Sequence, residues 1–474
     1  MVQTSPSPTR GIARELIALA LPLSVAGAAI AANDFVGRWI LSTLGPVTLA
    51  ATAPAALFAQ WLGVFFLAAA GYLASVVARR VGARDERGAG PALWPGLALA
   101  AIGGALAIAA IPLLPLVAAA ATRDAAVAEL IPRFGRWLLM AVGPGIALAA
   151  FNGLFIGIGR GGVVLALDGA ACVINAGLAW FLVRAETGPH LGVDGAGIAA
   201  VASTSGAVLV AAALAWTPRM RARYGTWDGR SGIVRRLRLF ISEAGAQGLS
   251  SVVSVAAWGW FFLVVGRFGR EPMAATNALM AWTVVAYVPM IAVGRAVTVA
   301  VGRATGAGDP GRARRIARTG CALAGMCAVV VGVAFVAGRE ALVGAFVPAG
   351  SEGGERIIAL GRQLMWVVAA WGIADAVVIA YAGALAGIGD VRWMCVAAPC
   401  CLGTLLVVPC LAILAAPDAW WGRLGAEPVV VLWFVSVANE IGWGWLLHRR
   451  FAAVTARHAT PRRGTDDAPA ATAA

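Results

Sequence analysis

The sequence contains no lysine and few charged residues of any kind. Charged residues make up 13% of the 474 positions, and all 37 basic residues are arginine. Soluble domains carry about 25% charged and roughly 45–50% apolar residues, whereas 60% of this chain is hydrophobic. A water-soluble fold cannot bury so much apolar surface in one domain. The composition therefore predicts a chain whose main solvent is the lipid bilayer.

Groupings of residues that support metal, redox or nucleotide chemistry are also scarce. The chain has three histidines, and its seven cysteines lie in or beside apolar runs without metal-ligand spacing. Gly-x-Gly stretches such as Gly157–Gly159 follow helical segments rather than strands, which excludes a dinucleotide-binding fold. The arginines lie in loops between apolar runs, which excludes nucleic acid as a partner. We expect no enzyme, no metal site and no cofactor.

Long apolar runs are what the sequence does have. A bilayer core takes roughly 20 helical residues per crossing. Backbone groups in lipid must be hydrogen-bonded within their own segment, so each such run is predicted to be a helix. Twelve runs are long enough, at residues 15–41, 47–78, 91–121, 134–158, 162–183, 194–216, 239–266, 272–301, 319–347, 358–386, 393–416 and 428–447.

The arginines predict how these segments are oriented. Twelve crossings place both termini on one side of the membrane. That side then holds 25 of the 37 arginines and the other side holds 11. Positive residues are enriched on the cytoplasmic side, so we expect a multi-pass protein of the plasma (inner) membrane with both termini cytoplasmic. The polar tail, residues 449–474, is predicted to be disordered.

The two halves of the chain resemble each other. LGPVTLAAT (Leu44–Thr52) is similar to FGREPMAAT (Phe268–Thr276), and VARRVGARD (77–85) to VGRATGAGD (301–309), both at an offset of 224; FNGLFIGIG (151–159) is similar to YAGALAGIG (381–389) at 230. The offset spans six crossings, so the halves are parallel repeats with a substrate site expected between them. We expect an N-terminal segment 1–14, an N-lobe 15–216, a linker 217–238 and a C-lobe 239–448.

These motifs resemble the multidrug and toxic compound extrusion (MATE) transporter family over nearly the whole chain. The resemblance rests on LGPVTLAAT, VGRATGAGDPGRARR and DAVVIAYAGALAGIGDVRW. It implies an all-α integral membrane protein, with 12 transmembrane helices in two parallel-repeat six-helix bundles forming a V. It also implies export of small organic compounds, cationic or amphipathic, driven by inward H⁺ or Na⁺. We expect the protein to be a monomer.

The acidic residues match this family only in part, and best its NorM-like branch. Asp375 matches that branch directly, but its helix 7 glutamate is replaced by Ser254. The acidic position near the end of the first helix falls on Gly37, and Asp34 lies one turn earlier. The DinF-like pair in helix 5 is present only as Asn175, because an alanine stands at its acidic position.

Four acids lie within predicted spans: Asp34, Asp168, Asp375 and Glu440. Carboxylates in a bilayer are costly, so they usually line a cavity and act there. We expect Asp375, and also Asp34, to bind the coupling H⁺ or Na⁺.

Structural alternatives remain open for each acid. Asp375 could instead hydrogen-bond or pair with Arg295, and Asp34 could pair with Arg38 at i,i+4. Asp168 could be solvated near a helix end, and Glu440 could pair with Arg449 or Arg450.

Several neutral or aromatic side chains could line the substrate cavity beside these acids. The alternatives for them are hydrogen bonds between helices and simple packing. The set comprises Asn175, Ser254, Asn277, Trp258 and Trp282, together with Glu440.

Two other functions compete with antiport. A lipid or lipid-linked oligosaccharide flippase of a related fold would need a strongly cationic cavity, and only Arg295 is clearly intramembrane. A polytopic membrane transferase would need clustered Asp or His at a membrane face, which the sequence lacks.

Overall fold

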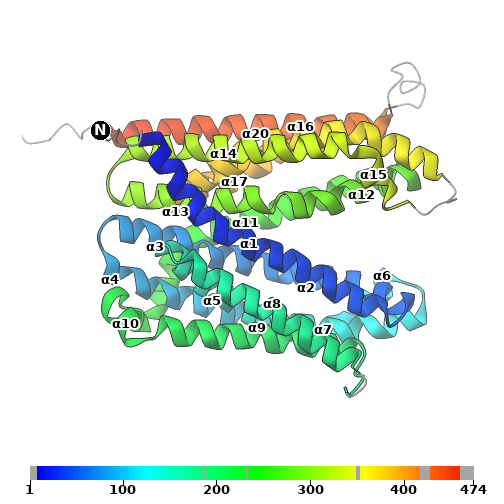
Figure 1. Cartoon of the computed structure of the whole chain (residues 1–474), viewed down its shortest axis with the longest axis horizontal. Coiled ribbons are helices and arrows are strands. Elements are labelled where there is room, and N and C mark those ends of the chain that lie inside the picture. The colour runs from blue at the N-terminus through cyan, green and yellow to red at the C-terminus, as the bar shows by residue number, and fades with distance from the viewer. Residues whose placement is uncertain (1–7, 186–187, 231, 348–352, 417–426, 460–474) are drawn as a thin grey trace, which may run out of the picture.

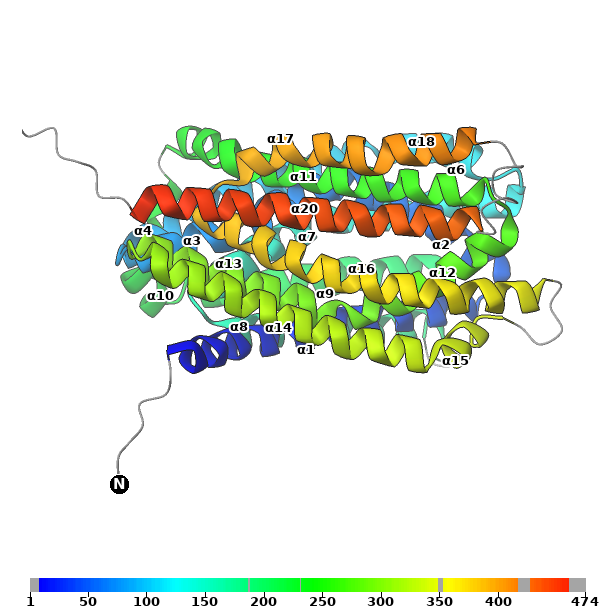
Figure 2. The ribbon, with the colours of Figure 1, turned by 90° about the horizontal axis from the view of Figure 1, so that it is seen from above.

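The computed structural model describes residues 8–185, 188–230, 232–347, 353–416 and 427–459, and these are folded almost entirely as helices (Figure 1). Within these ranges, twelve helical segments are long and apolar enough to cross a membrane. The sequence therefore predicted the number of spans correctly. Both described chain ends, at Pro8 and Ala459, lie at the same end of the molecule, which we call the terminus end (Figures 1 and 2).

The first six spans form the N-lobe, which fills the lower half of Figure 1, although α1 begins in the upper half and crosses obliquely into the lower one. The long helix α7 packs against α2, α5 and α9, while α1 packs against α8. The helices are α1 (Pro8–Ser42), α2 (Pro46–Gly71), α3 (Leu73–Gly82), α4 (Glu86–Ala89), α5 (Leu93–Ala109), α6 (Leu114–Ala121), α7 (Ala125–Gly157), α8 (Gly161–Val183) and α9 (Val193–Ala215).

The last six spans form the C-lobe, in the upper half of Figure 1. Here α16 packs against α14, α20 and α13, and α11 packs against α17. The helices are α11 (Ile233–Gly266), α12 (Arg270–Ala286), α13 (Val288–Gly306), α14 (Pro310–Ala337), α15 (Arg339–Gly344), α16 (Gly354–Ile388), α17 (Val391–Leu402), a π-helical turn (Gly403–Val407), α18 (Val408–Ala415) and α20 (Pro428–Ala459).

The eighth span differs from the expected single helix over residues 272–301. The segment is divided into α12 and α13, which meet at Tyr287, and α13 by itself is long and apolar enough to cross a membrane. Pro289 lies in the first turn of α13, where its missing N–H costs nothing but where it cannot continue the preceding helix. The proline therefore divides the span.

The internal repeat is visible in the local geometry of two turns. Asp85 accepts a hydrogen bond from the backbone N–H of Gly88 (2.9 Å), and Asp309 from that of Arg312 (2.7 Å). Each carboxylate thereby caps the helix that follows it. The preceding residues also match, because Arg84 and Gly308 have φ values of 61° and 72°. The sequence pair found at offset 224 therefore adopts one conformation in both lobes.

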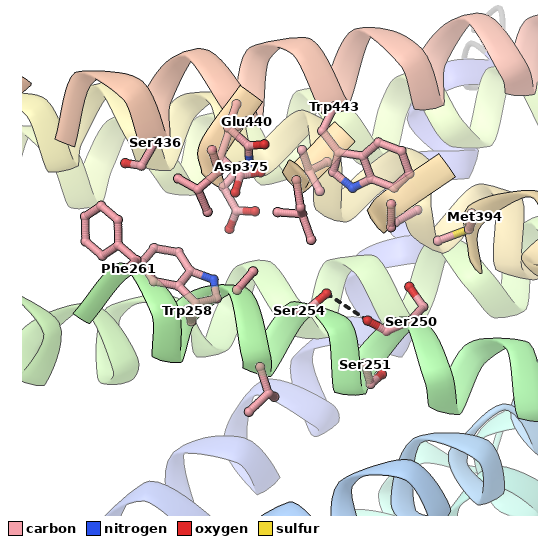
Figure 3. A pocket seen from close by; sticks show the side chains of 18 of the residues that line it. Ser250, Ser251, Ser254, Trp258, Phe261, Asp375, Met394, Ser436, Glu440 and Trp443 are labelled. Atoms are coloured by element: carbon pink, nitrogen blue, oxygen red, sulfur yellow. Dashed lines mark hydrogen bonds between the residues drawn. The ribbon is translucent and has the colours of Figure 1, made fainter. Parts of the chain in front are cut away.

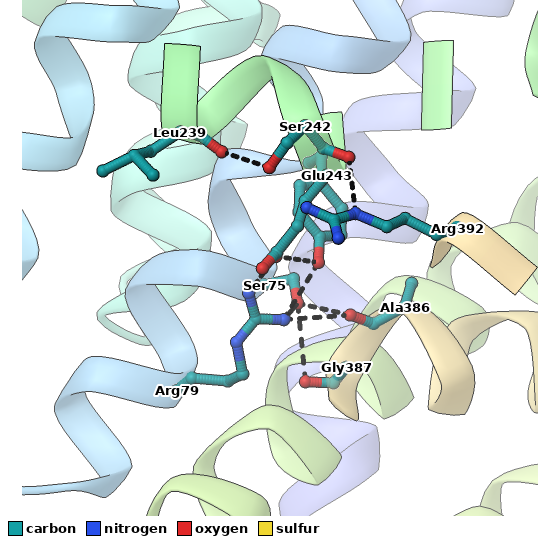
Figure 4. Close-up of polar contacts among 9 residues, drawn as sticks. Ser75, Arg79, Leu239, Ser242, Glu243, Ala386, Gly387 and Arg392 are labelled. Carbon is teal, nitrogen blue, oxygen red and sulfur yellow. Dashed lines mark hydrogen bonds and ion pairs between the residues drawn. The ribbon is translucent and has the colours of Figure 1, made fainter. Parts of the chain in front are cut away.

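The two lobes meet closely at the terminus end, where α3 packs against α13. Arg79 of α3 donates to the backbone oxygen of Ala386 (3.5 Å), as Figure 4 shows, and Arg303 of α13 donates to that of Gly157 (3.2 Å). These two arginines are 224 residues apart and each reaches the opposite lobe. A Cβ atom on Gly306 would clash with the backbone oxygen of Arg79. Glycine is therefore required for this approach.

The lobes also contact each other along α2 and α11, where Gly248 of α11 lies against Phe65 of α2. Towards the opposite end, α12 packs mainly against α16, α11 and α15 of its own lobe. By contrast α13, the continuation of α12 towards the terminus end, packs against both α1 and α3. The structure is therefore closed between the lobes at the terminus end.

The linker and the tail are shorter than the sequence analysis expected. Residues 217–238 contain α10 (Pro218–Tyr224), a 3-10 turn (Asp228–Arg230) and the first residues of α11. The helix α20 continues to Ala459 because Arg450 pairs with Asp390 (2.6 Å) and Phe451 is buried. Disorder predicted from residue 449 is therefore wrong for 449–459, and residues 460–474 lie outside the described part of the chain.

Candidate functional site

A cavity of about 420 Å³ lies inside the C-lobe, between α11, α16, α17 and α20 (Figure 3). Asp375 of α16 and Glu440 of α20 both line it. Its other polar lining residues are Gln247, Ser250, Ser251, Ser254, Ser436 and Asn439, and the larger apolar ones include Trp258, Phe261, Met394 and Trp443.

The two carboxyl groups lie close enough to interact electrostatically. They are brought together because α16 and α20 pack side by side along the length of the C-lobe (Figure 2). Among the described residues, neither Asp375 nor Glu440 forms an ion pair. Two partly buried carboxyl groups without a counter-charge repel each other when both are ionised. The pair therefore favours binding of a proton or a metal cation.

The arginines considered as partners for these acids lie elsewhere. Arg450 pairs with Asp390, and the guanidinium of Arg449 lies over the ring of Trp445 at 4.9 Å. Arg295 interacts with Asp168 instead of Asp375. The structural alternatives based on ion pairs are therefore wrong for Asp375 and Glu440.

The wall opposite the acids is a stripe of hydroxyl groups on α11 (Figure 3). Ser254 donates to the backbone oxygen of Ser250 (3.0 Å), and Ser251 to that of Gln247 (3.2 Å). These bonds use the hydroxyl protons, so the oxygen lone pairs remain available to a ligand. The amide oxygen of Asn439 is buried and has no hydrogen-bond partner. Oxygen acceptors thus line the same cavity as the carboxyl pair.

One end of the cavity is closed by packed aromatic rings. Trp258 contacts Phe261 (5.5 Å between ring centroids), Trp371 (5.4 Å) and Trp433 (6.5 Å). Trp433 is fully buried, whereas Trp258 lines the cavity. This wall is aromatic, and the face of a tryptophan ring attracts organic cations.

The N-lobe contains a different polar cluster. Asn152 of α7 donates to both carboxylate oxygens of Asp168 of α8, at 2.9 and 3.2 Å. Arg295 projects from α13 of the C-lobe and interacts with the same carboxylate, without forming a direct ion pair. Asp168 is 9% exposed, so the solvated position considered for it is wrong. This acid is already hydrogen-bonded and has a cation nearby.

The remaining candidate residues lie outside the acidic cavity. Asp34 is exposed on α1 and forms no ion pair with Arg38 in the described structure. Asn175 donates to the side-chain oxygen of Asn33 (3.0 Å), which joins α8 to α1. Asn277 is exposed on α12.

Trp282 points towards α15, away from this cavity. Its indole nitrogen donates to the backbone oxygen of Leu342 (2.9 Å), and its ring packs on Phe346. Among the aromatic candidates, only Trp258 shares the cavity with Asp375.

The sequence analysis missed Ser250, Ser251 and Ser436 as lining residues. A signal for the first two was present, because polar residues recur at i, i+3, i+4 and i+7 within an otherwise apolar run, at Gln247, Ser250, Ser251 and Ser254. A comparable signal was present for Ser436, because Ser436, Asn439 and Glu440 also recur at helical spacing within an apolar run.

One known family profile matches the sequence of both lobes. The MatE family profile matches residues 22–181 and again residues 250–411. The two matches cover more than half of the chain and fall in the N-lobe and the C-lobe respectively.

Curated relatives carry the name NorM. The chain is 26% identical over 470 residues to the probable multidrug resistance protein NorM of Pseudomonas aeruginosa, covering 96% of this chain and 93% of the relative. It is also 26% identical over 453 residues to the multidrug resistance protein NorM of Burkholderia vietnamiensis, covering 92% and 90%.

Solved structures share the fold at low sequence identity. An outward-facing multidrug resistance MATE family transporter superposes with a TM-score of 0.84 at 17% identity, covering 95% of this chain and 97% of the other. A variant of VcmN, a MATE transporter of Vibrio cholerae, gives 0.82 at 16% identity, covering 95% and 98%. This similarity extends over both lobes.

Proposed function

Because the chain belongs to the MatE family of membrane transporters, we propose that it is a secondary active antiporter that exports small organic compounds in exchange for H⁺ or Na⁺. The proposed substrates are cationic or amphipathic. The coupling ion binds at the carboxyl pair of Asp375 and Glu440, and the substrate enters the space that these residues face.

One observation carries this proposal: two carboxyl groups share a cavity, and no basic side chain is among its described lining residues. An intramembrane acid without a partner is costly unless it binds a cation. A proton, a sodium ion or the cationic group of a substrate could each supply the missing charge. Because these ligands compete for the same carboxyl groups, binding of one favours release of another.

Alternating access follows from this competition. A ligand shifts a conformational equilibrium only through its different affinities for the two states. The structure is closed between the lobes at the terminus end, which the arginine distribution assigns to the cytoplasm. In this state, ion binding at Asp375 and Glu440 promotes substrate release to the outside. The state open to the cytoplasm then releases the ion and takes up new substrate.

The relatives support the class of substrate. The curated relatives are named multidrug resistance proteins. The apolar wall formed by Trp258 and Phe261 beside two acids suits a flat organic cation. A flippase that holds a pyrophosphate-linked lipid would instead need basic residues in this position. Within the described cavity lining there is none.

Transport by reconstituted protein tests the proposal directly. The purified chain is reconstituted into proteoliposomes, and these vesicles are loaded with a fluorescent organic cation. A pH gradient and a sodium gradient are then imposed in separate experiments. We expect export driven by one of the two gradients and lost in Asp375→Asn. Export that requires neither gradient, or that survives unchanged in Asp375→Asn, would refute the coupling site.

A further inference from the structure

We propose that a second cavity, at the terminus end, binds the phosphate group of an anionic lipid. This cavity has a volume of about 470 Å³ and lies between α3, α5 and α11, where the two lobes meet. Arg79 and Arg80 line it from the N-lobe, and Arg236 and Glu243 line it from the C-lobe. It shares no lining residue with the acidic cavity, so this proposal goes beyond the transport site.

The charges of this cavity favour an anion. Glu243 accepts a hydrogen bond from Arg79 at 2.7 Å (Figure 4), and Asp85 pairs with Arg80 at 3.6 Å. Both acids in the lining are therefore already paired. Arg236 lines the same cavity, and no hydrogen bond or ion pair engages its guanidinium within the described part of the chain. A guanidinium with free N–H groups matches the oxygen atoms of a phosphate.

The apolar part of the lining favours a lipid over a soluble anion. Val76, Leu239 and Phe240 line the cavity, and Leu239 remains 65% exposed. Arg236, Leu239, Phe240 and Glu243 follow the i, i+3, i+4, i+7 spacing of one helix face. A head group at Arg236 would therefore place an acyl chain along Leu239. Basic pockets between membrane helices on the cytoplasmic side are suited to phosphate-bearing head groups.

The position of the cavity gives the lipid a conformational effect. Its walls come from both lobes, and Gly306 of α13 lies in the lining beside Arg79. If the lobes separated at this end, α3 and α11 would move apart and the cavity would be lost. A ligand that binds only the closed arrangement stabilises it in proportion to ligand concentration. The bound lipid therefore holds the terminus end closed.

Lipid-dependent unfolding of the purified chain tests this site without any need for transport. Thermal unfolding is followed by intrinsic tryptophan fluorescence after addition of phosphatidylglycerol, phosphatidylcholine at the same mole ratio, or inorganic phosphate. We expect phosphatidylglycerol alone to raise Tm. In Arg236→Gln its half-saturating concentration should rise by about tenfold, as expected for loss of a charged hydrogen bond.

A matched variant distinguishes a site from general electrostatic attraction. Arg235→Gln removes the same charge one residue away, outside the cavity lining, and should respond to phosphatidylglycerol like the unaltered chain. Equal weakening in both variants, or equal responses to the two lipids, would refute the site. An equal Tm increase with inorganic phosphate would show a soluble anion and refute the lipid. As a folding control, the Tm of Arg236→Gln is measured without added lipid. It should equal the Tm of the unaltered chain.

Discussion

The two lobes contain carboxyl groups within their membrane spans in opposite electrostatic situations. In the C-lobe, Asp375 and Glu440 face one cavity and lack a neighbouring cation. In the N-lobe, Asp168 accepts two hydrogen bonds from Asn152 and has Arg295 nearby. A compensated carboxylate needs no ion from solution, whereas an uncompensated pair does. We infer that the C-lobe binds the coupling ion and that Asp168 stabilises helix packing.

The largest expected difference is between two single variants that carry the same Asp→Asn substitution, one in each lobe. Asp375→Asn removes a titratable group from the uncompensated pair. The coupling ion then no longer binds one conformational state more tightly than the other, so gradient-driven export should fall by at least about tenfold. Asp168→Asn should retain most of the export rate because Asp168 is already compensated. The measurement is the initial rate of export of a fluorescent organic cation from proteoliposomes.

Membrane insertion and folding serve as the control for this pair of variants. Both should purify as folded protein with similar yields in detergent. Coupling lost in Asp168→Asn but retained in Asp375→Asn would reverse the assignment of the two lobes.

A smaller effect is expected when the second acid is moved within the cavity. Glu440→Gln leaves Asp375 as the single carboxyl group, so export should be reduced but not abolished. Ser254 lines the same cavity from α11, so Ser254→Glu in the Glu440→Gln background should restore part of the export rate. A control variant, Asn277→Glu, places the new acid on exposed α12 outside the cavity and should restore nothing.

The smallest expected effect is on stability, and it concerns the hydrogen bonds of the N-lobe. Asn152→Ala removes the donor to Asp168, and leaving a buried acceptor unsatisfied costs about 1–3 kcal/mol in the free energy of unfolding. Asn277→Ala changes an exposed amide and should have little effect. The measurement is the Tm of each purified variant. An unchanged Tm for Asn152→Ala would show that Asp168 does not depend on this bond.

Much of the fold was predictable because hydropathy and motif spacing are local properties. The twelve spans follow from run lengths, and the repeat follows from pairs such as Val77–Asp85 and Val301–Asp309. The division of the eighth span at Tyr287 was missed, although Pro289 was visible. Proline is tolerated in many membrane helices, so its presence alone did not reveal a break.

Individual residues of the candidate site could be predicted from the sequence, but the way in which they come together in one cavity could not. Asp375, Glu440 and Ser254 were each recognisable as polar residues in apolar runs. Their common cavity depends on the packing of α11, α16 and α20, which no local pattern encodes. The partner of Arg295 illustrates the same limit. The sequence suggested Asp375, whereas the structure places Asp168 of the other lobe near it.

The sequence by itself determined the solvent of this protein, the number of crossings and the duplication, because these depend on composition and on order along the chain. Only the tertiary structure decided which buried charges are compensated and where the lobes touch. The free energy of a buried charge depends on the distance to its neighbours in space. For this chain those neighbours lie on helices far apart in sequence.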